Sequence, residues 1–251
     1  MNGPVLHERS LVRRRRASLG HNAKEVSMGD AKSISISKLI IIPAVITLGV
    51  TILRLVGELA HWPTPWFSAV AGGGAAVVGI SWLPIIFGPY FALKLAGTGD
   101  RPSSTGKSIA YAFAALVVYV LAGFLFAKTV SHPSALTAVA LLLMLAAAFV
   151  PCLGWRSLGC ALFAYALAAR IPVLIVMYFA MYGKGGAGWG THYDAVPPAL
   201  AHVPLATKYL YAAILPQMTM WIGWTGVLGA IFGSVVAAVA GRGKQTAPAG
   251  A

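Results

Sequence analysis

Six long apolar stretches constrain this chain more than any other feature of its sequence. The first five are about 19–24 residues each, close to the ~20 that an α-helix needs to cross ~30 Å of hydrocarbon. The six stretches cover residues 39–59, 77–95, 109–127, 134–152, 158–181 and 209–240. They predict an all-α fold, namely a polytopic membrane helix bundle with six transmembrane helices.

The composition excludes the main soluble alternatives. The chain is 58% hydrophobic and only 10% charged, whereas an ordinary soluble domain is about 25% charged. So much apolar surface does not fit inside one water-soluble core, which excludes a soluble enzyme, a disordered chain and a disulfide scaffold. We expect the lipid bilayer of the cell membrane to surround the protein.

The last apolar stretch is too long for a simple crossing. Its roughly 32 residues would extend about 48 Å as a single α-helix. Either its first part projects beyond the bilayer as far as Pro216, or the helix breaks there. A tight hairpin is the remaining alternative, and it would move the C-terminus to the other side of the membrane.

The positive charges predict the orientation. With the N-terminus inside, three of the 19 lysines and arginines, Lys128, Lys184 and Lys208, fall in outer segments. Arg54 and Arg170 lie within the spans, and the other 14 are on the inner side. Cytoplasmic segments carry such an excess of basic residues, so we expect both termini in the cytoplasm.

The spans and the basic segments that flank them define the domain organisation. Residues 1–36 are predicted to be a basic, disordered cytoplasmic tail, within which Met28 offers an alternative start. Residues 37–241 form the predicted transmembrane domain and residues 242–251 a short cytoplasmic tail. The net charge of +13 is explained by topology and by attraction to anionic lipid, so no nucleic-acid partner is expected.

A polar stripe runs along the first predicted span. Thr47, Thr51, Arg54, Glu58 and His61 are spaced by four, three, four and three residues, so they share one face of an α-helix. Charges within a span usually face the bundle interior or a wet cavity. The stripe is therefore either part of a pathway opening outward, or an Arg54–Glu58 pair near the interface with Arg54 reaching toward the headgroups.

Arg170 is the more costly charge, because it lies near the middle of the fifth span. Glu58 is the only acidic residue inside a span, which makes it the expected counter-ion. We predict an intramembrane polar cluster of Thr51, Arg54, Glu58 and Arg170 joining the first and fifth spans. It could be a functional site or a polar clamp that fixes helix register.

A second group of residues is predicted at the outer face. His61, His192 and Asp194 all lie in outer segments, and imidazole and carboxylate groups can bind metals or act in catalysis. Their spacing matches no metal-binding motif. We therefore expect no metal and no cofactor, and no catalytic residue can be assigned.

The last span has a face of small residues for close helix packing. Gly229, Gly233 and Ala237 recur every four residues. This face could form a seam within the bundle, or it could contact a membrane-protein partner or a second copy of the chain.

Three classes of function remain after these exclusions. The sequence favours a non-catalytic accessory or scaffolding membrane subunit, because polar residues inside the spans are sparse. A transporter or channel for a small molecule or ion, using the polar cluster, is the first alternative. An integral membrane enzyme with an outer-face His/Asp site is the second. A continuous wet cavity that reaches Arg170 would favour transport, and a dry bundle with an exposed apolar flank would favour the accessory role. Convergence of His61, His192 and Asp194 within ligand distance would favour the enzyme.

Overall fold

A computed structural model gives the structure of residues 34–72, 76–131 and 134–245, with side-chain surroundings as far as residue 241. All regular structure within these ranges is helical, which confirms the predicted all-α fold. Nearly all of the predicted N-terminal tail, with Met28, lies outside the described residues, as does the end of the predicted C-terminal tail.

Five helical segments of the described chain are long and apolar enough to cross a membrane. They are the segments of a membrane protein, and they match five of the six predicted spans in sequence. Their bounds are Ile36–Leu59 (α2), Thr105–Thr129 (α4), Ala135–Leu153 (α5, Ala135–Ala147, with the short helix η1, Val150–Leu153), Arg156–Gly186 (α6) and Leu205–Gly241.

The predicted second span differs from the expectation. Only its second half is helical, as α3 (Pro84–Gly97), whereas residues 76–83 form bends without regular structure. Proline at the first position of α3 explains this boundary, because its ring presets the first helical turn but supplies no amide donor. The 14 residues of α3 extend only about 21 Å as a helix, so α3 alone is too short for a full crossing.

The last long segment is irregular but does not turn back on itself. It consists of α7 (Leu205–Tyr209), a π-helical turn η3 (Leu210–Ile214), α8 (Leu215–Met218) and α9 (Met220–Gln245). These elements follow one another without an intervening loop, so the hairpin alternative is wrong. The break predicted near Pro216 is present as the π-helical turn and a dislocation between α8 and α9.

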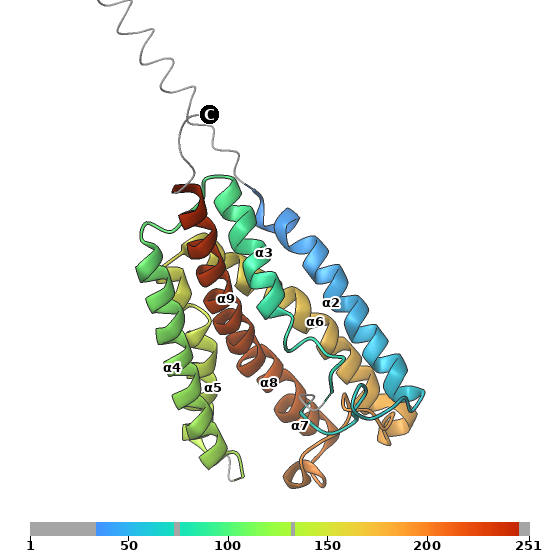
Figure 1. Ribbon diagram of the computed structural model, residues 1–251. Helices are drawn as coiled ribbons and strands as arrows, with labels where there is room; N and C mark the ends of the chain where they lie inside the picture. Colours follow the sequence, from blue (N-terminus) through green and yellow to red (C-terminus); the bar gives the residue numbers. More distant parts are fainter. Residues whose placement is uncertain (1–33, 73–75, 132–133, 246–251) are drawn as a thin grey trace, which may run out of the picture. The chain divides into compact units, whose positions relative to one another are not determined.

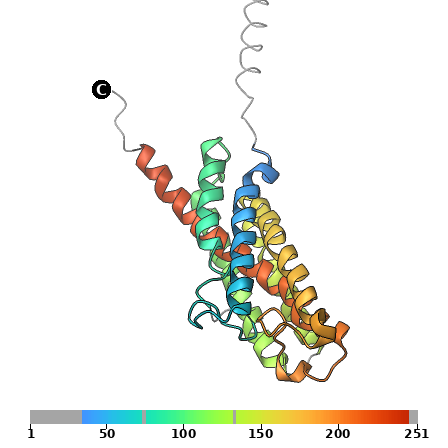
Figure 2. The same cartoon turned by 90° about the vertical axis from the view of Figure 1, so that its right-hand side faces the viewer.

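Helix α9 lies at the centre of the bundle and packs against α3, α4, α5 and α6. Figure 2 shows it inclined to α2 and α3. It approaches α3 closely: a Cβ atom added to Gly88 would overlap the backbone of Gly229, and one added to Gly233 would press on the carbonyl of Gly88. The Gly229/Gly233 face is therefore occupied within the bundle, as the seam interpretation predicts.

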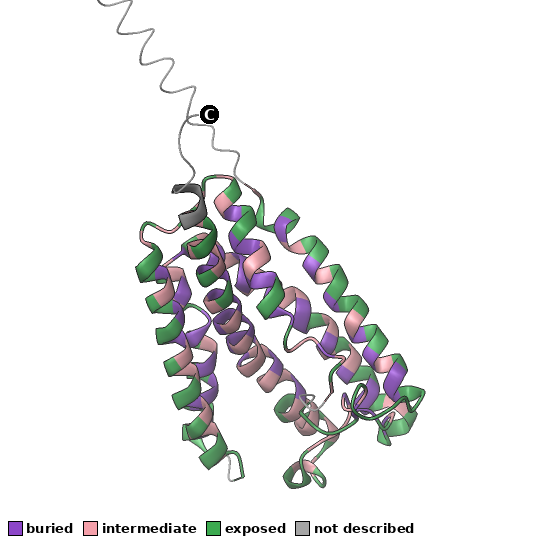
Figure 3. Cartoon of the chain, viewed as in Figure 1, coloured by how far each residue is buried: buried purple, intermediate pink, exposed green. Residues whose placement is uncertain are grey.

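The outer flanks of the helices carry the apolar side chains that lipid would cover. Figure 3 shows exposed residues along the outward faces and buried residues where helices meet. Ile41, Leu121 and Phe124 are each more than half exposed although fully apolar. Such continuous apolar exposure is expected where hydrocarbon, rather than water, is the solvent.

The bundle has two chemically distinct ends. Figure 1 shows the start of α2 and the end of α9 at one end, here called the terminal end. Residues 60–72, which follow α2, and the connection 187–204 lie at the opposite end, here called the loop end. The terminal end also carries Lys94, Arg101, Lys107 and Arg156, which flank α3, α4 and α6 there.

Candidate functional site

The polar stripe of α2 faces the interior of the bundle over most of its length. Thr47, Thr51, Arg54 and Glu58 are all buried. Thr47 shares a 2.8 Å hydrogen bond with the Tyr165 hydroxyl on α6, which ties the two helices together. His61 does not continue the stripe, because it follows the end of α2, is exposed and adopts a positive φ of 53°.

Near the loop end, Glu58 is the centre of a buried network. Arg54 Nε donates to Glu58 Oε1 at 2.7 Å, an ion pair between side chains one helical turn apart. The backbone amide of His192 donates to Glu58 Oε2 at 2.8 Å, and the His192 ring Nδ1 lies 2.6 Å from Oε1. Arg54 also donates to the Ser68 carbonyl at 3.0 Å. The Arg54–Glu58 pair therefore holds both connections of the loop end against α2.

The segment carrying His192 is shaped by Asp194. The Asp194 carboxylate accepts hydrogen bonds from the amides of Gly190 and Thr191 and from the Thr191 hydroxyl, at 2.6–2.9 Å. Tyr193, which lies between His192 and Asp194, is buried, and its hydroxyl donates a hydrogen bond of 3.1 Å to the Thr51 carbonyl. Asp194 thus closes a tight turn, and its carboxylate is used within the loop rather than at an open site.

Burial sets the protonation of the two aromatic residues in this segment. Desolvation lowers the pKa of His192, and the nearby Arg54 charge adds to this effect while Glu58 and Asp194 oppose it. The neutral ring then carries its proton on Nδ1, where it donates to Glu58. Burial also raises the pKa of Tyr193 well above its ordinary value. At neutral pH both side chains are therefore uncharged hydrogen-bond donors.

Arg170 does not join the Glu58 network. The expected Arg170–Glu58 contact is absent among the described residues, where Glu58 pairs only with Arg54 and His192. Arg170 instead donates from Nη1 to Gln217 Oε1 at 3.4 Å, and its guanidinium lies 4.9 Å from the Trp221 ring centre. The prediction that Arg170 binds Glu58 is therefore wrong, because Glu58 is consumed by partners nearer the loop end.

The guanidinium of Arg170 is buried without a counter-ion in the described part of the chain. The residue is only 4% exposed, and its Nε has no hydrogen-bond partner there. A buried charge held only by a weak amide contact and an aromatic ring leaves donor capacity unused.

A cavity of about 820 Å³ connects the two arginines. It extends from the connections at the loop end to Arg170 near the middle of α6, and its volume suits a drug-sized organic ligand. Polar groups gather on its walls among a larger apolar surface. The polar lining includes Thr51, Arg54, Arg170, His192, Tyr193, Gln217 and Thr219.

The irregular segment α7–α9 forms one wall of this cavity. The π-helical turn precedes Gln217, and Thr219 departs from helical geometry with φ −120° and ψ −73°. This dislocation lies between Gln217 and Trp221, the two residues that contact Arg170. Such π-helical turns and broken helices are common at functional sites in membrane proteins.

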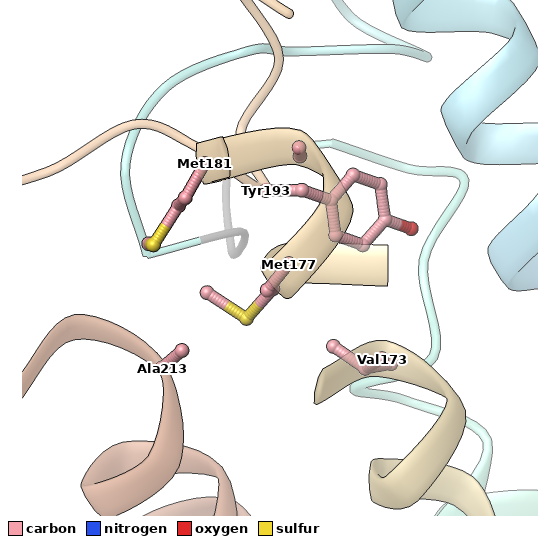
Figure 4. Close-up of a cluster of buried hydrophobic side chains, with 6 residues drawn as sticks. Val173, Met177, Met181, Tyr193 and Ala213 are labelled. Carbon is pink, nitrogen blue, oxygen red and sulfur yellow. The ribbon is translucent and has the colours of Figure 1, made fainter. Parts of the chain in front are cut away.

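An apolar cluster closes the cavity toward α6. Figure 4 shows Val173, Met177 and Met181 projecting from successive turns of α6, with Tyr193 and Ala213 beside them. Met177 faces Ala213 of the π-helical turn, and its sulfur accepts a 3.7 Å contact from Gln217 Nε2. The amide that binds Arg170 is therefore oriented from both sides.

The three predicted outer-face residues have different surroundings. His192 joins Glu58, Asp194 shapes its own loop, and His61 stays apart. Across the described ranges, no group of three or more His, Cys, Asp or Glu side chains is arranged to hold a metal ion. Sequence reasoning also missed Trp221 and Tyr193; their only signals were the four-residue spacing from Gln217 and adjacency to His192.

Comparisons with known proteins add no further constraint. No family model, no curated protein and no solved structure matches this chain.

Proposed function

We propose that this protein is a membrane-embedded binding protein of the transporter class whose ligand is an anion. The observation that carries the proposal is Arg170, a buried guanidinium on the wall of an 820 Å³ cavity, with an unpartnered Nε and no carboxylate partner in the described chain. An incoming oxyanion would supply the missing charge and acceptor.

The distorted helical segment α7–α9 supports the transporter class over a purely structural role. π-helical turns inside helices occur frequently at functional sites. Here the dislocation at Thr219 and the mid-helix Arg170 face the same cavity. The accessory-subunit role favoured by the sequence accounts for the apolar flanks, but it gives no reason for a cavity at Arg170.

The charge distribution supports a cell-membrane orientation with the terminal end in the cytoplasm. Lys94, Arg101, Lys107 and Arg156 flank helices at that end, whereas Lys128, Lys184 and Lys208 lie at the loop end. The cavity would then open toward the outer face.

Binding to the full-length protein in phosphatidylcholine nanodiscs tests the proposal. The probes are butyrate, decanoate, inorganic phosphate and decyl phosphate, each titrated against empty nanodiscs as a blank. We expect saturable binding of at least one anion, lost in Arg170→Gln and kept in Lys184→Gln, which changes an outer lysine. Proteoliposomes loaded with the binding anion should then show protein-dependent exchange.

If no probe binds, or if binding is equal in the Arg170→Gln variant, the anion-binding proposal is wrong. Stable co-purification of the protein with a membrane complex, together with absent anion binding, would instead support the accessory role.

A further inference from the structure

We infer that the ligand is an amphipathic anion with a single hydrocarbon chain, bound with its oxyanion head at Arg170 and its chain directed between α5 and the π-helical turn into the bilayer. This inference rests on the proposed anion-binding function and specifies its ligand class. Three observations carry it: the free edge of Arg170, the apolar mouth of the cavity and the depth of that mouth.

The first observation concerns the geometry of the guanidinium. Nη1 is engaged by Gln217, and the Trp221 ring lies against the guanidinium. Nε has no hydrogen-bond partner within the described chain, and together with Nη2 it forms the remaining side edge of the guanidinium. This edge is the one that binds a carboxylate or phosphate through two parallel hydrogen bonds. The head of the ligand is therefore an oxyanion approaching in the plane of the guanidinium.

The second observation concerns the exposure of residues that line the cavity. Several of its lining residues are also exposed on the apolar flank: Leu142 is 61% exposed and Tyr211 46%, and Ala138 is exposed between them. Leu142 and Ala138 belong to α5, and Tyr211 belongs to the π-helical turn. We place the mouth of the cavity between these two elements.

The third observation is the depth of this mouth. Leu142 lies seven residues after the start of α5 at Ala135, or about 10 Å along the helix axis from its outer end. At that depth the surroundings are hydrocarbon, so a small hydrated anion would leave a wet cavity in contact with lipid chains. A hydrocarbon chain instead fills the mouth with matching apolar surface.

The volume is compatible with this ligand class. A cavity of about 820 Å³ holds a drug-sized molecule, which leaves room for one oxyanion head and its hydrocarbon chain. The shared chemistry is a single-chain carboxylate or phosphate monoester. Both membrane lipid and the aqueous phase can supply such a molecule.

The nanodisc panel tests the ligand class directly. Each buried methylene contributes about fourfold in affinity, so decanoate should bind at least about 60-fold more tightly than butyrate if three of its six additional methylenes are buried. Decyl phosphate should exceed inorganic phosphate in the same way. Arg170→Gln should weaken the long-chain anions about 10- to 100-fold, because a charge-assisted hydrogen bond is removed.

A second pair of variants tests the path of the ligand's hydrocarbon chain independently of Arg170. Ala138→Phe places a ring in the mouth, and we expect it to weaken decanoate at least about tenfold while leaving the protein folded, since residue 138 is exposed. Val139→Phe is the matched control, because Val139 is 45% exposed on the same helix and does not line the cavity. It should leave decanoate binding unchanged.

The outcomes separate this inference from the function on which it rests. Arg170-dependent binding with no preference for chain length keeps the anion-binding function and overturns the amphipathic ligand. Equal weakening by Ala138→Phe and Val139→Phe overturns the proposed path of the chain. Long-chain binding of unchanged affinity in Arg170→Gln is adsorption to apolar surface and overturns both.

Discussion

Replacement of Glu58 by glutamine should destabilise this protein more than any other single loss of carboxylate charge in the described chain. Glu58 is the acceptor for three donors: Arg54 Nε at 2.7 Å, the His192 amide at 2.8 Å and the His192 ring at 2.6 Å. Its side chain is completely inaccessible to solvent. Water therefore cannot replace a lost acceptor, and the charge of Arg54 loses its compensation.

The size of the effect follows from this geometry. Glutamine retains one acceptor oxygen but presents an amide group, itself a donor, to the remaining donors of Arg54 or His192. Breaking a buried ion pair costs about 3–5 kcal/mol, and for a chain of this size about 3 kcal/mol corresponds to roughly 6–12 °C in melting temperature. The connection 187–204 should also become accessible to protease first, because His192 fastens it to α2.

Equilibrium unfolding in detergent, followed by helical circular dichroism, measures the loss. Asp100→Asn is the matched control, because Asp100 accepts one hydrogen bond of 3.1 Å from Trp155 Nε1 and is only partly buried. That change should cost about 1 kcal/mol or less. If Glu58→Gln destabilises the protein no more than Asp100→Asn, the Glu58 network does not hold the loop end together.

Three further predictions address pH, packing and orientation. Acidification from about pH 7.5 to about 5.5 should reduce the free energy of unfolding, because burial lowers the pKa of His192 and the unfolded chain therefore binds the proton first. Unfolding measured as a function of pH should show a smaller loss of stability in His192→Gln, because this variant lacks the titrating ring. Gly88→Ala should cost about 1–3 kcal/mol through overlap with the α9 backbone, whereas Gly49→Ala, with open space around its Cβ, should change the free energy of unfolding by less than about 1 kcal/mol. In a background lacking both native cysteines, His202→Cys should react with an impermeant thiol reagent from outside intact cells and Lys107→Cys only after lysis; the reverse pattern would invert the proposed topology.

The periodicity of α2 was predictable because a helix imposes it locally. Thr47, Thr51, Arg54 and Glu58 must share a face once residues 36–59 are helical, and burial of that face follows from the cost of polar groups in lipid. His61 escapes the pattern because the helix ends at Leu59. The same local logic predicted the Arg54–Glu58 pair as one of its two alternatives.

The partner of Arg170 was not predictable by the same means. The choice of Glu58 relied on a count of acidic residues inside the spans, and it ignored donors from the connections. The fold brings the His192 amide and ring to Glu58 from 134 residues away. Only the tertiary course of residues 187–204 decides this pairing, and helical spacing carries no information about that course.

The extent of α3 shows a third limit. Hydropathy alone extended the second span back to residue 77, because residues 77–83 are largely apolar. Helical structure begins only at Pro84. Among the residues that precede it, Ser81 has its carbonyl bound by Trp224 Nε1 of α9, which donates a hydrogen bond of 2.8 Å. A side chain from α9 satisfies that backbone group, so a non-helical segment is tolerated where protein rather than lipid surrounds it.

Of the two arginines inside the spans, Arg54 has a carboxylate partner and Arg170 has none among the described residues. This contrast argues for a ligand. Arg54 is neutralised by Glu58 one turn away. A clamp at Arg170 would likewise stabilise the bundle best with every donor paired, yet its buried Nε is unsatisfied by the described residues, at a cost of about 1–3 kcal/mol. A bound oxyanion recovers this cost only in the folded state, and at 100 times its Kd a ligand adds about 2.7 kcal/mol of stability. The bundle should therefore be measurably more stable with its anion than without it, and a clamp that needs no ligand should show no such gain.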